Sequence, residues 1–212
     1  MKTILCFGDS NTWGFNPSNG ERYPKAIRWP TVLAASLEAE FPGEYEVIAE
    51  GQNGRTTVWE DPVGQKNGSA YLLPCLETHK PVDLVILMLG TNDLKHRFGL
   101  SSYDVARGTA YLAGMVKTSE FGPGNSASAV LIVAPPPLGK LSAFVQEFEG
   151  GAEKSLTLGR DILAYAALKG FPCFEAGSVI RSSDRDGIHL EPEEHRKLGE
   201  ALASRVIELI GR

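Results

Sequence analysis

The chain has 212 residues, of which 42% are hydrophobic and 22% charged, and its formal net charge is −5. This length fits a single domain, taken as residues 1–212, that can bury a sizeable core. The negative charge and the lack of any basic run argue against a nucleic-acid-binding protein, which normally presents a basic face.

The first residues carry no recognisable targeting signal. Only four apolar residues, from Ile4 to Phe7, precede Gly8 and Asp9, whereas a signal peptide needs an apolar stretch of roughly seven to fifteen residues. No run reaches the roughly eighteen apolar residues of a membrane span. We therefore expect no membrane association and a cytoplasmic location.

The cysteine content agrees with that expectation. The three cysteines, Cys6, Cys75 and Cys173, are widely spaced and form no CxxC pair. We expect all three to be buried free thiols, which suits a reducing compartment.

Short apolar runs alternate with helical patterns along the chain. Strands are predicted at residues 3–7, 46–49, 83–89, 129–134 and 171–175. The run from Leu84 to Leu89 is apolar throughout, which is typical of a central parallel strand covered on both faces. Helices are predicted at 29–41, 101–117, 156–169 and 192–210, with a shorter one at 69–79 that contains Pro74.

Strands that alternate with helices predict an α/β fold, namely a three-layer α/β/α flavodoxin-like sandwich with a five-stranded parallel sheet. In such sheets ligands bind beyond the carboxyl ends of the strands. Three stretches do not fit the alternation and are predicted to be long surface loops: 13–27, 55–68 and 135–151. Long ordered loops are often functional.

Two motifs follow the first two predicted strands. Gly8-Asp9-Ser10 follows the first strand, where a serine hydroxyl would stand at the edge of the sheet; an ordinary turn or helix-cap serine is the alternative. Gly51-Gln52-Asn53-Gly54 follows the second strand, where glycines let backbone N–H groups approach a ligand; a plain turn is again the alternative.

Two further motifs follow the third strand and precede the last helix. Gly90-Thr91-Asn92-Asp93 places an amide where it can donate to a developing negative charge, although Asn and Asp are also common in turns. Asp186-Gly187-Ile188-His189 spaces a carboxylate three residues ahead of an imidazole. Asp186 can thus accept a hydrogen bond from Nδ1 and leave Nε2 free as a base.

In this order the four motifs resemble the four sequence blocks of the SGNH (GDSL) hydrolase superfamily, from Gly8 to His189. The words Gly-Asp-Ser-Asn-Thr-Trp-Gly, Gly-Thr-Asn-Asp and Asp-Gly-Ile-His resemble its bacterial arylesterase and acyltransferase (perhydrolase) branch. The resemblance implies a serine esterase acting on short-chain acyl or aryl esters, including acetylated carbohydrates, with acyl transfer to alcohols or peroxide. It implies no metal or organic cofactor.

The resemblance also implies roles for single residues. Ser10 is expected to be the nucleophile, His189 the general base, and Asp186 the carboxylate that orients it. The backbone N–H groups of Ser10 and Gly54 and the side-chain amide of Asn92 are expected to form the oxyanion hole.

Other residues near these blocks are candidates for further roles. Because the second block reads Gly-Gln-Asn-Gly, Asn53 is an alternative to Gly54 as the second donor. Trp13 and Arg55 are candidate substrate-binding residues, although Trp13 is equally consistent with an ordinary packed aromatic. Further residues that could border the entrance are Lys95, Phe144 and Phe148.

The remaining histidines give no sign of a metal site. His79, His96 and His195 have no neighbours at metal-ligand spacing, so solvated or supporting roles are expected.

The expected partners are a small ester substrate and further copies of the chain. The resemblance implies a homo-oligomer, a tetramer or octamer, with the 135–151 loop as a contact element. Two alternatives keep the fold and change the function. One is a thioesterase or lysophospholipase-like hydrolase. The other is a domain that binds a nucleotide or phosphoryl group, which the absence of a G-x-G-x-x-G or Walker loop disfavours.

Overall fold

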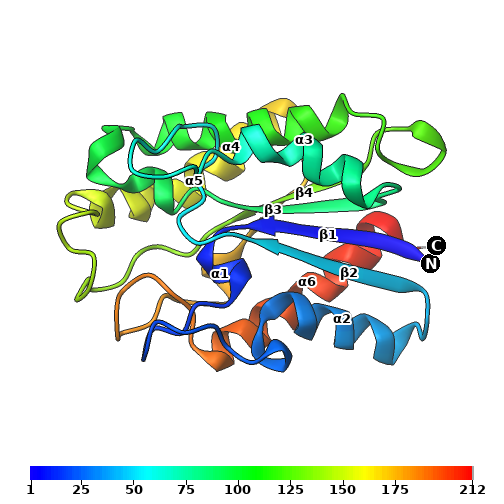
Figure 1. Ribbon diagram of the computed structural model, residues 1–212, viewed down its shortest axis with the longest axis horizontal. Coiled ribbons are helices and arrows are strands. Elements are labelled where there is room, and N and C mark those ends of the chain that lie inside the picture. Colours follow the sequence, from blue (N-terminus) through cyan, green and yellow to red (C-terminus); the bar gives the residue numbers. More distant parts are fainter. Residues whose placement is uncertain (212) are drawn as a thin grey trace.

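A computed structural model describes residues 1–211 and contains one five-stranded sheet (Figure 1). All neighbouring strands are parallel, and their order is β2-β1-β3-β4-β5. The predicted α/β fold with a five-stranded parallel sheet is therefore confirmed. The strands are β1 (Lys2–Gly8), β2 (Tyr45–Gly51), β3 (Leu84–Met88), β4 (Ala129–Ala134) and β5 (Cys173–Glu175).

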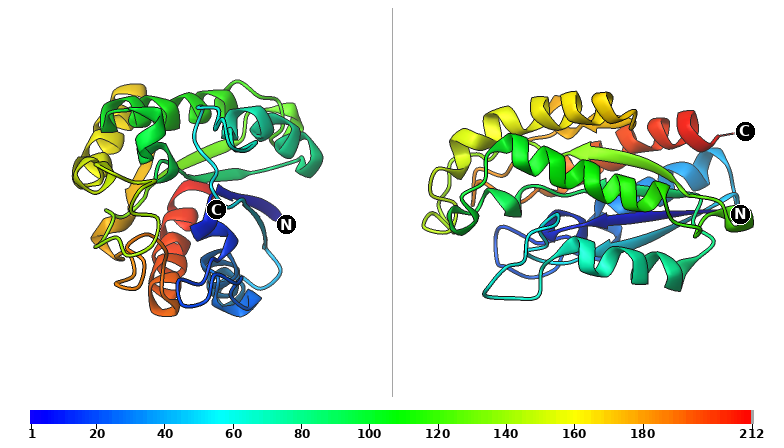
Figure 2. Two further views of the ribbon diagram at one scale, coloured as in Figure 1. Left: turned by 60° about the vertical axis from the view of Figure 1, so that its left-hand side comes forward. Right: turned by 90° about the horizontal axis from the view of Figure 1, so that it is seen from above.

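Helices cover both faces of the sheet and complete the three layers (Figures 1 and 2). One layer contains α2 and α6, which pack against each other, and the opposite layer contains α3, α4 and α5. The helices are α1 (Ser10–Trp13), α2 (Trp29–Glu40), α3 (Gly68–His79), α4 (Ser102–Lys117), α5 (Gly151–Lys169) and α6 (Pro192–Ile210). Short 3-10 turns occur at Lys25–Ile27, Asn92–Leu94, His96–Phe98, Pro123–Asn125 and Ala176–Ser178.

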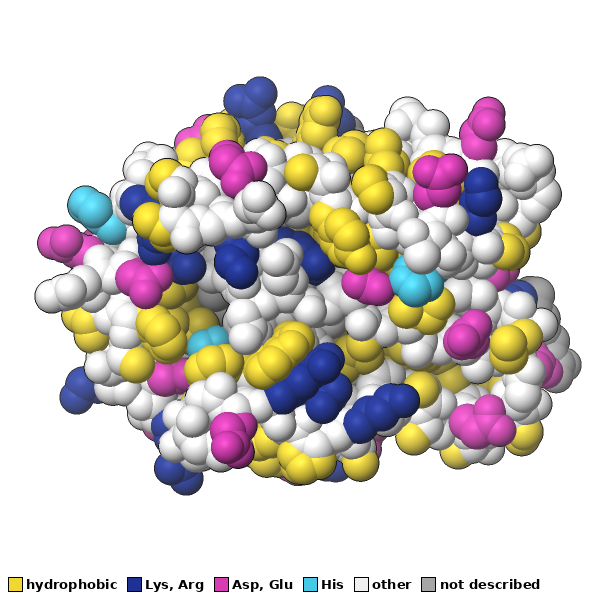
Figure 3. Space-filling view, viewed as in Figure 1, with side chains coloured by type: hydrophobic (Ala, Val, Ile, Leu, Met, Phe, Trp, Pro, Cys, Tyr) yellow, Lys and Arg dark blue, Asp and Glu magenta, His cyan; other side chains and the backbone are white. Residues whose placement is uncertain are grey.

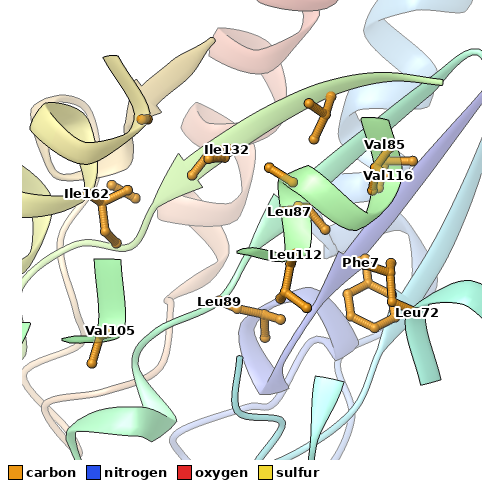
Figure 4. Packing of buried hydrophobic residues seen from close by; sticks show 14 of the residues in the cluster. Phe7, Leu72, Val85, Leu87, Leu89, Val105, Leu112, Val116, Ile132 and Ile162 are labelled. Atoms are coloured by element: carbon orange, nitrogen blue, oxygen red, sulfur yellow. The ribbon is translucent and has the colours of Figure 1, made fainter. Parts of the chain in front are cut away.

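Alternate residues of each central strand face opposite layers, as the two-residue period of a strand requires. On β1, Leu5 and Phe7 belong to the core beneath α3, α4 and α5, whereas Ile4 and Cys6 belong to the core above α2 and α6. Figure 4 shows the first of these cores. Burial on both faces explains why the central strands are apolar throughout.

Two helices differ in detail from the sequence prediction. Helix α5 begins at Gly151, five residues before the predicted start, and Gly150 precedes it with φ of 70°. Helix α3 continues through Pro74. A proline there removes one backbone hydrogen bond, but Leu72 and Leu76 on either side of it are fully buried, so packing retains the helix.

The strand order determines where the loops at the carboxyl edge of the sheet separate. The chain passes from β1 to β2 on one side and then to β3 on the other side of β1. The loops after β1 and β3 therefore diverge at the carboxyl edge, which is where open α/β sheets bind ligands. Among residues 1–211, no helix is long and apolar enough to cross a membrane.

Candidate active site

Ser10 begins the short helix α1, directly beyond the carboxyl end of β1. The Asp9 side chain caps this helix by accepting a hydrogen bond from Asn11 N at 2.9 Å. A Cβ on Gly8 would lie 2.0 Å from Thr12 Oγ1, so only glycine permits the turn from strand to helix to close this tightly. The sharp turn leaves the Ser10 hydroxyl at the edge of the sheet.

The structure brings His189 and Asp186 to that hydroxyl. His189 Nε2 lies 3.0 Å from Ser10 Oγ, and His189 Nδ1 lies 2.6 Å from Asp186 Oδ2. All three residues are at most 6% exposed. Ser10 and His189 are 179 residues apart in sequence, so the topology of the sheet creates this hydrogen-bonded line.

Backbone groups fix the carboxylate of Asp186. Its Oδ1 accepts hydrogen bonds from the N–H groups of Ile188 and His189, at 2.8 and 2.9 Å. Burial alone would raise the pKa of Asp186, but the hydrogen bonds from the His189 ring and from these two N–H groups lower it below its usual value. Asp186 is therefore a carboxylate that accepts the hydrogen bond from His189 Nδ1–H.

The residues around His189 form the histidine loop (residues 182–190), which is buried except at Asp184 and Arg185. Gly187 has φ of 81°, and a Cβ there would lie 2.7 Å from Lys140 O, so this position needs glycine. Asn11 ties the loop to α1: its Oδ1 accepts from Leu190 N at 3.1 Å and its Nδ2 donates to Ile188 O at 3.4 Å. The sequence interpretation gave Asn11 no role, although it directly follows Ser10.

The loops after β2 and β3 supply donors near the serine. Gly54 has φ of 80°, and within residues 1–211 its backbone N–H and that of Ser10 donate to no other group. Asn92 is 6% exposed, and its Nδ2 lies 3.2 Å from Arg55 O and 3.4 Å from Asp9 Oδ2. Asn53, the alternative donor, has a buried side-chain oxygen without a partner among the described residues.

Arg55 lies behind the site rather than at its entrance. Its side chain is 3% exposed, and Nη1 donates to the backbone oxygens of Gly8, at 2.7 Å, and of Glu50. The guanidinium stacks 4.1 Å from the centre of the Phe7 ring. These contacts join the ends of β1 and β2, so the geometry favours a positioning role over the substrate contact expected from the sequence.

Two buried carboxyls near the site were interpreted from the sequence only as turn or cap residues. Asp93 is fully buried and accepts hydrogen bonds from Thr57 N and, at 2.5 Å, from Thr57 Oγ1. Burial raises the pKa of Asp93 to about 6, and burial likewise raises that of Asp9 to about 6. Asp93 thereby links the end of β3 to the loop after β2; no charge pattern in the sequence indicates this contact.

Aromatic side chains flank the imidazole. The Phe15 ring stacks on His189 with centroids 4.0 Å apart and an interplanar angle of 26°. The Phe144 ring meets His189 edge-on at 6.2 Å. Trp13 is half-buried and covered by Arg22, whose guanidinium lies 4.9 Å from its ring. Phe15, two residues beyond the candidate Trp13, is therefore the aromatic residue of this segment that contacts the site.

Two other candidates, Lys95 and Phe148, are both buried. Lys95 lies beside Glu147, with 3.4 Å between Nζ and the nearer carboxylate oxygen. Phe148 is 3% exposed and packs into the core beneath α3, α4 and α5. Of the pair Phe144 and Phe148, only Phe144 reaches the site.

The sequence indicated no metal-ligand neighbours for His79, and the structure brings two such side chains beside it. Its ring, the Cys75 thiol and the Glu50 carboxylate offer ligand atoms that all lie within 4.8 Å of one another. The sequence conceals the cluster because Glu50 comes from a different element. All three cysteines are free, as expected, and Cys6 and Cys75 are buried; the prediction of burial is wrong for Cys173, which is half-buried.

The chain is similar to known proteins in both sequence and structure. Residues 6–197 match the GDSL-like lipase/acylhydrolase family. The structure is similar to that of the native aryl esterase of M. smegmatis, with a TM-score of 0.92 and 45% identity over 99% of this chain and 100% of that chain. No curated protein matches the chain.

Two structures from Sinorhizobium meliloti are also similar. The carbohydrate acetylesterase Est24 has a TM-score of 0.91 and 42% identity, over 98% of this chain and 99% of that one. A carbohydrate acetylesterase family member has a TM-score of 0.92 and 36% identity, over 100% of both chains. All these matches extend over the loops that meet at Ser10 as well as over the sheet.

Proposed function

Because the chain belongs to the GDSL-like lipase/acylhydrolase family and is a carboxylic ester hydrolase, we propose that Ser10 is its nucleophile, His189 its general base and Asp186 the residue that orients the base. The observation that carries this proposal is the continuous line of hydrogen bonds from Ser10 Oγ through the His189 ring to Asp186. A serine hydroxyl is a poor nucleophile without such a base.

In the acylation step, Ser10 Oγ attacks the carbonyl carbon of the ester while His189 Nε2 takes the hydroxyl proton. Asp186 stabilises the imidazolium that forms. When the ester C–O bond breaks, His189 returns the proton to the departing alkoxide. In the second step His189 takes a proton from water as the water oxygen attacks the acyl carbon. The bond from that carbon to Ser10 Oγ then breaks, His189 returns the proton to Oγ, and the carboxylic acid is released. An alcohol or peroxide in place of water would complete an acyl transfer.

The tetrahedral intermediate carries a negative oxygen that needs donors. We assign this role to the backbone N–H groups of Ser10 and Gly54 and to the Asn92 amide. The two N–H groups are free of other partners within the described chain, and the Asn92 amide is buried beside them at the sheet edge. Donors fixed in a buried site stabilise developing charge without reorganisation.

The proposed substrates are short-chain acyl esters and aryl esters, with acetylated carbohydrates among them. The similar structures are of an aryl esterase and of carbohydrate acetylesterases. The aromatic rings of Phe15 and Phe144 beside His189 offer an apolar wall for a small acyl or aryl group.

A fluorophosphonate probe followed by peptide mapping tests the mechanism. We expect one label per chain, on Ser10, and none in Ser10→Ala, whereas Ser18→Ala, which removes an exposed serine nearby, should label normally. Label on another residue would refute the assignment. Turnover of p-nitrophenyl acetate, acyl-CoA and lysolipid then identifies the substrate class, because faster turnover of either of the last two would favour a thioesterase or a lysophospholipase.

We also propose that the chain forms a homo-oligomer, a tetramer or octamer. Tyr111 on α4 and Leu168 on α5 are 62% and 74% exposed. Tyr111 lines a cavity of about 660 Å³ together with Trp59 and Met115. Large exposed apolar patches commonly mark interfaces. Light scattering should give the larger mass for the wild type and a smaller one for Tyr111→Lys; a wild-type monomer at micromolar concentration would contradict the proposal.

The proposed location is the cytoplasm. The three cysteines are unpaired thiols, and unpaired thiols persist in reducing compartments.

A further inference from the structure

A cluster of metal-binding side chains lies on the α3 side of the sheet, apart from the catalytic line. Glu50 stands near the carboxyl end of the edge strand β2, and Cys75 and His79 lie one turn apart on α3. The carboxylate oxygen, the thiol sulfur and the imidazole nitrogen offered by these residues all lie within 4.8 Å of one another.

We propose that Glu50, Cys75 and His79 bind a divalent metal ion of intermediate softness, with Zn²⁺ as the preferred ion. One sulfur, one nitrogen and one oxygen ligand suit zinc, whereas magnesium and calcium prefer oxygen ligands alone. Tetrahedral zinc bonds of 2.0–2.3 Å place ligand atoms about 3.4 Å apart. The present spread of up to 4.8 Å therefore closes with side-chain rotations of about 1 Å.

The surroundings of the cluster allow an ion to enter and support its ligands. The Glu50 and His79 side chains are 22% and 26% exposed, and a cavity of about 530 Å³ adjoins Glu50 and Tyr71. Water from this side can occupy the fourth position, as in three-ligand zinc sites. The Tyr71 hydroxyl lies 3.5 Å from Glu50 Oε2, so it can hold the ligating carboxylate in place.

Protons and one cation compete with the metal. Without an ion, His79 Nε2 and Glu50 Oε1 pair at 2.9 Å, and burial raises the pKa of the Cys75 thiol to about 12. Binding must displace the thiol proton, so the affinity rises with pH. The competing cation is the Arg55 guanidinium, which lies 5.5 Å from the centre of the Tyr71 ring. The negative charges of the Glu50 carboxylate and the Cys75 thiolate together offset the positive charge of a metal ion bound near Arg55.

A bound ion would join α3 to the end of β2. The metal–ligand bonds would link two elements that otherwise contact each other through side chains, so the ion would stabilise the folded protein. The ester chemistry assigned to Ser10 does not require it. The proposal therefore stands or falls separately from the proposed nucleophile, and Ser10→Ala should bind the ion like the wild type.

Cobalt titration of the chain without an affinity tag tests the site. We expect one equivalent of Co²⁺ to bind with a thiolate-to-cobalt charge-transfer band, and Zn²⁺ to displace it. Cys75→Ser should abolish the band, and His79→Ala and Glu50→Gln should weaken binding at least about tenfold. Matched controls are Cys173→Ser, a half-buried thiol elsewhere, and His96→Ala, an exposed imidazole; both should bind like the wild type.

Three results would overturn the proposal: no stoichiometric Co²⁺ or Zn²⁺ binding by the wild type, a charge-transfer band that survives Cys75→Ser, or a band that Cys173→Ser removes. Circular dichroism checks the fold of each variant. If Cys75→Ser is unfolded, the affinities of His79→Ala and Glu50→Gln test the site instead, because these two side chains are half-buried and lie outside the hydrophobic core. Unchanged affinity in these two variants would exclude the site.

Discussion

Two loops lie at the His189 ring: the histidine loop, which contains it, and the loop of residues 135–150. They are anchored in different ways. The histidine loop is buried from Asp186 to Leu190, and its bonds to Asn11 and to the Asp186 carboxylate are internal to the site. The loop of residues 135–150 is instead exposed from 142 to 146. Its hydrogen bonds to neighbouring segments include Gly139 N to Gly187 O, Ser142 Oγ to Arg185 O, and His96 N to Glu147 O.

Figure 3 shows the molecular surface, with charged and apolar side chains interspersed on the face seen in Figure 1. The two loops near His189 meet different physical requirements of the reaction. Groups that transfer protons need fixed geometry and are placed on the anchored loop. Groups that contact a variable substrate can lie on the exposed loop, where replacement costs little stability. Five predictions test this division, in order of decreasing effect.

The largest effect is expected for Asp186→Asn. The amide oxygen of the new Asn can still accept the hydrogen bonds from Ile188 N and His189 N, but its NH₂ group would face His189 Nδ1 and cannot accept a hydrogen bond from it. We therefore expect kcat for p-nitrophenyl acetate to fall by about 10⁴-fold. Asp184→Asn, in the same loop but exposed, should retain wild-type kcat. A loss of less than tenfold at Asp186 would mean that the carboxylate does not orient the base.

Asn92→Ala should follow. Loss of one oxyanion donor typically lowers kcat by about 100- to 1,000-fold, and KM should change little because the donor acts on the transition state. Asn53→Ala provides the comparison, since its side-chain oxygen has no partner among the described residues. If the Asn53 variant loses as much kcat as the Asn92 variant, the assignment of the donors must be revised.

Asn11→Ala tests the anchoring itself. The variant keeps every group of the triad but loses the two bonds that tie the histidine loop to α1, at Leu190 N and Ile188 O. Because misplacement by about 1 Å can cost about 100-fold, we expect kcat to fall by about 10- to 100-fold. Asn19→Ala, an exposed asparagine in the 13–27 loop, serves as the control. Equal activity of the two variants would show that the loop holds its position without Asn11.

Asp93→Asn should change how stability depends on pH. Burial raises the pKa of Asp93 to about 6 in the folded protein, against about 4 when unfolded. The folded state thus holds the extra proton between these values, and the stability that Asp93 contributes is complete below about pH 4 and is lost as the pH rises to about 6.

The difference in free energy of unfolding between wild type and Asp93→Asn should therefore fall by about 1–3 kcal/mol between pH 4 and pH 7. Urea unfolding at each pH measures it, and Asp9 remains in both proteins, so its own titration largely cancels. A difference that is constant with pH would show that Asp93 ionises normally.

The smallest effect on the chemistry is expected for Phe144→Ala, in the exposed loop. We expect kcat for an acetyl ester to change by less than about tenfold, while the preference between acetyl and butyryl esters changes by about tenfold, since apolar pockets discriminate by about 1–3 kcal/mol per methylene. Val145→Ala, the exposed neighbour, should change neither. A collapse of kcat in Phe144→Ala would contradict the division between anchored and exposed loops.

Much of this molecule follows from local sequence. The continuous apolar run over Leu84–Met88 predicts a central strand because both of its faces must be buried, and the periodicity of 192–210 predicts α6 with its observed ends. The pairing of Asp186 with His189 is also local, since the two residues lie three positions apart in one tight turn. Helix α5 begins earlier than predicted because glycines and exposed polar residues at its start carry no helical periodicity.

Local sequence was enough to predict which chemical groups follow which strands, because strand ends and turns depend on neighbouring residues. Which of those groups come into contact depends on the folded arrangement of the chain. Arg55 turned toward backbone oxygens instead of substrate, Phe15 stacked on the imidazole, and Glu50 met Cys75 and His79. Each of these contacts depends on side-chain direction and on strand order, which couple residues far apart in the chain and leave no periodic trace in its sequence.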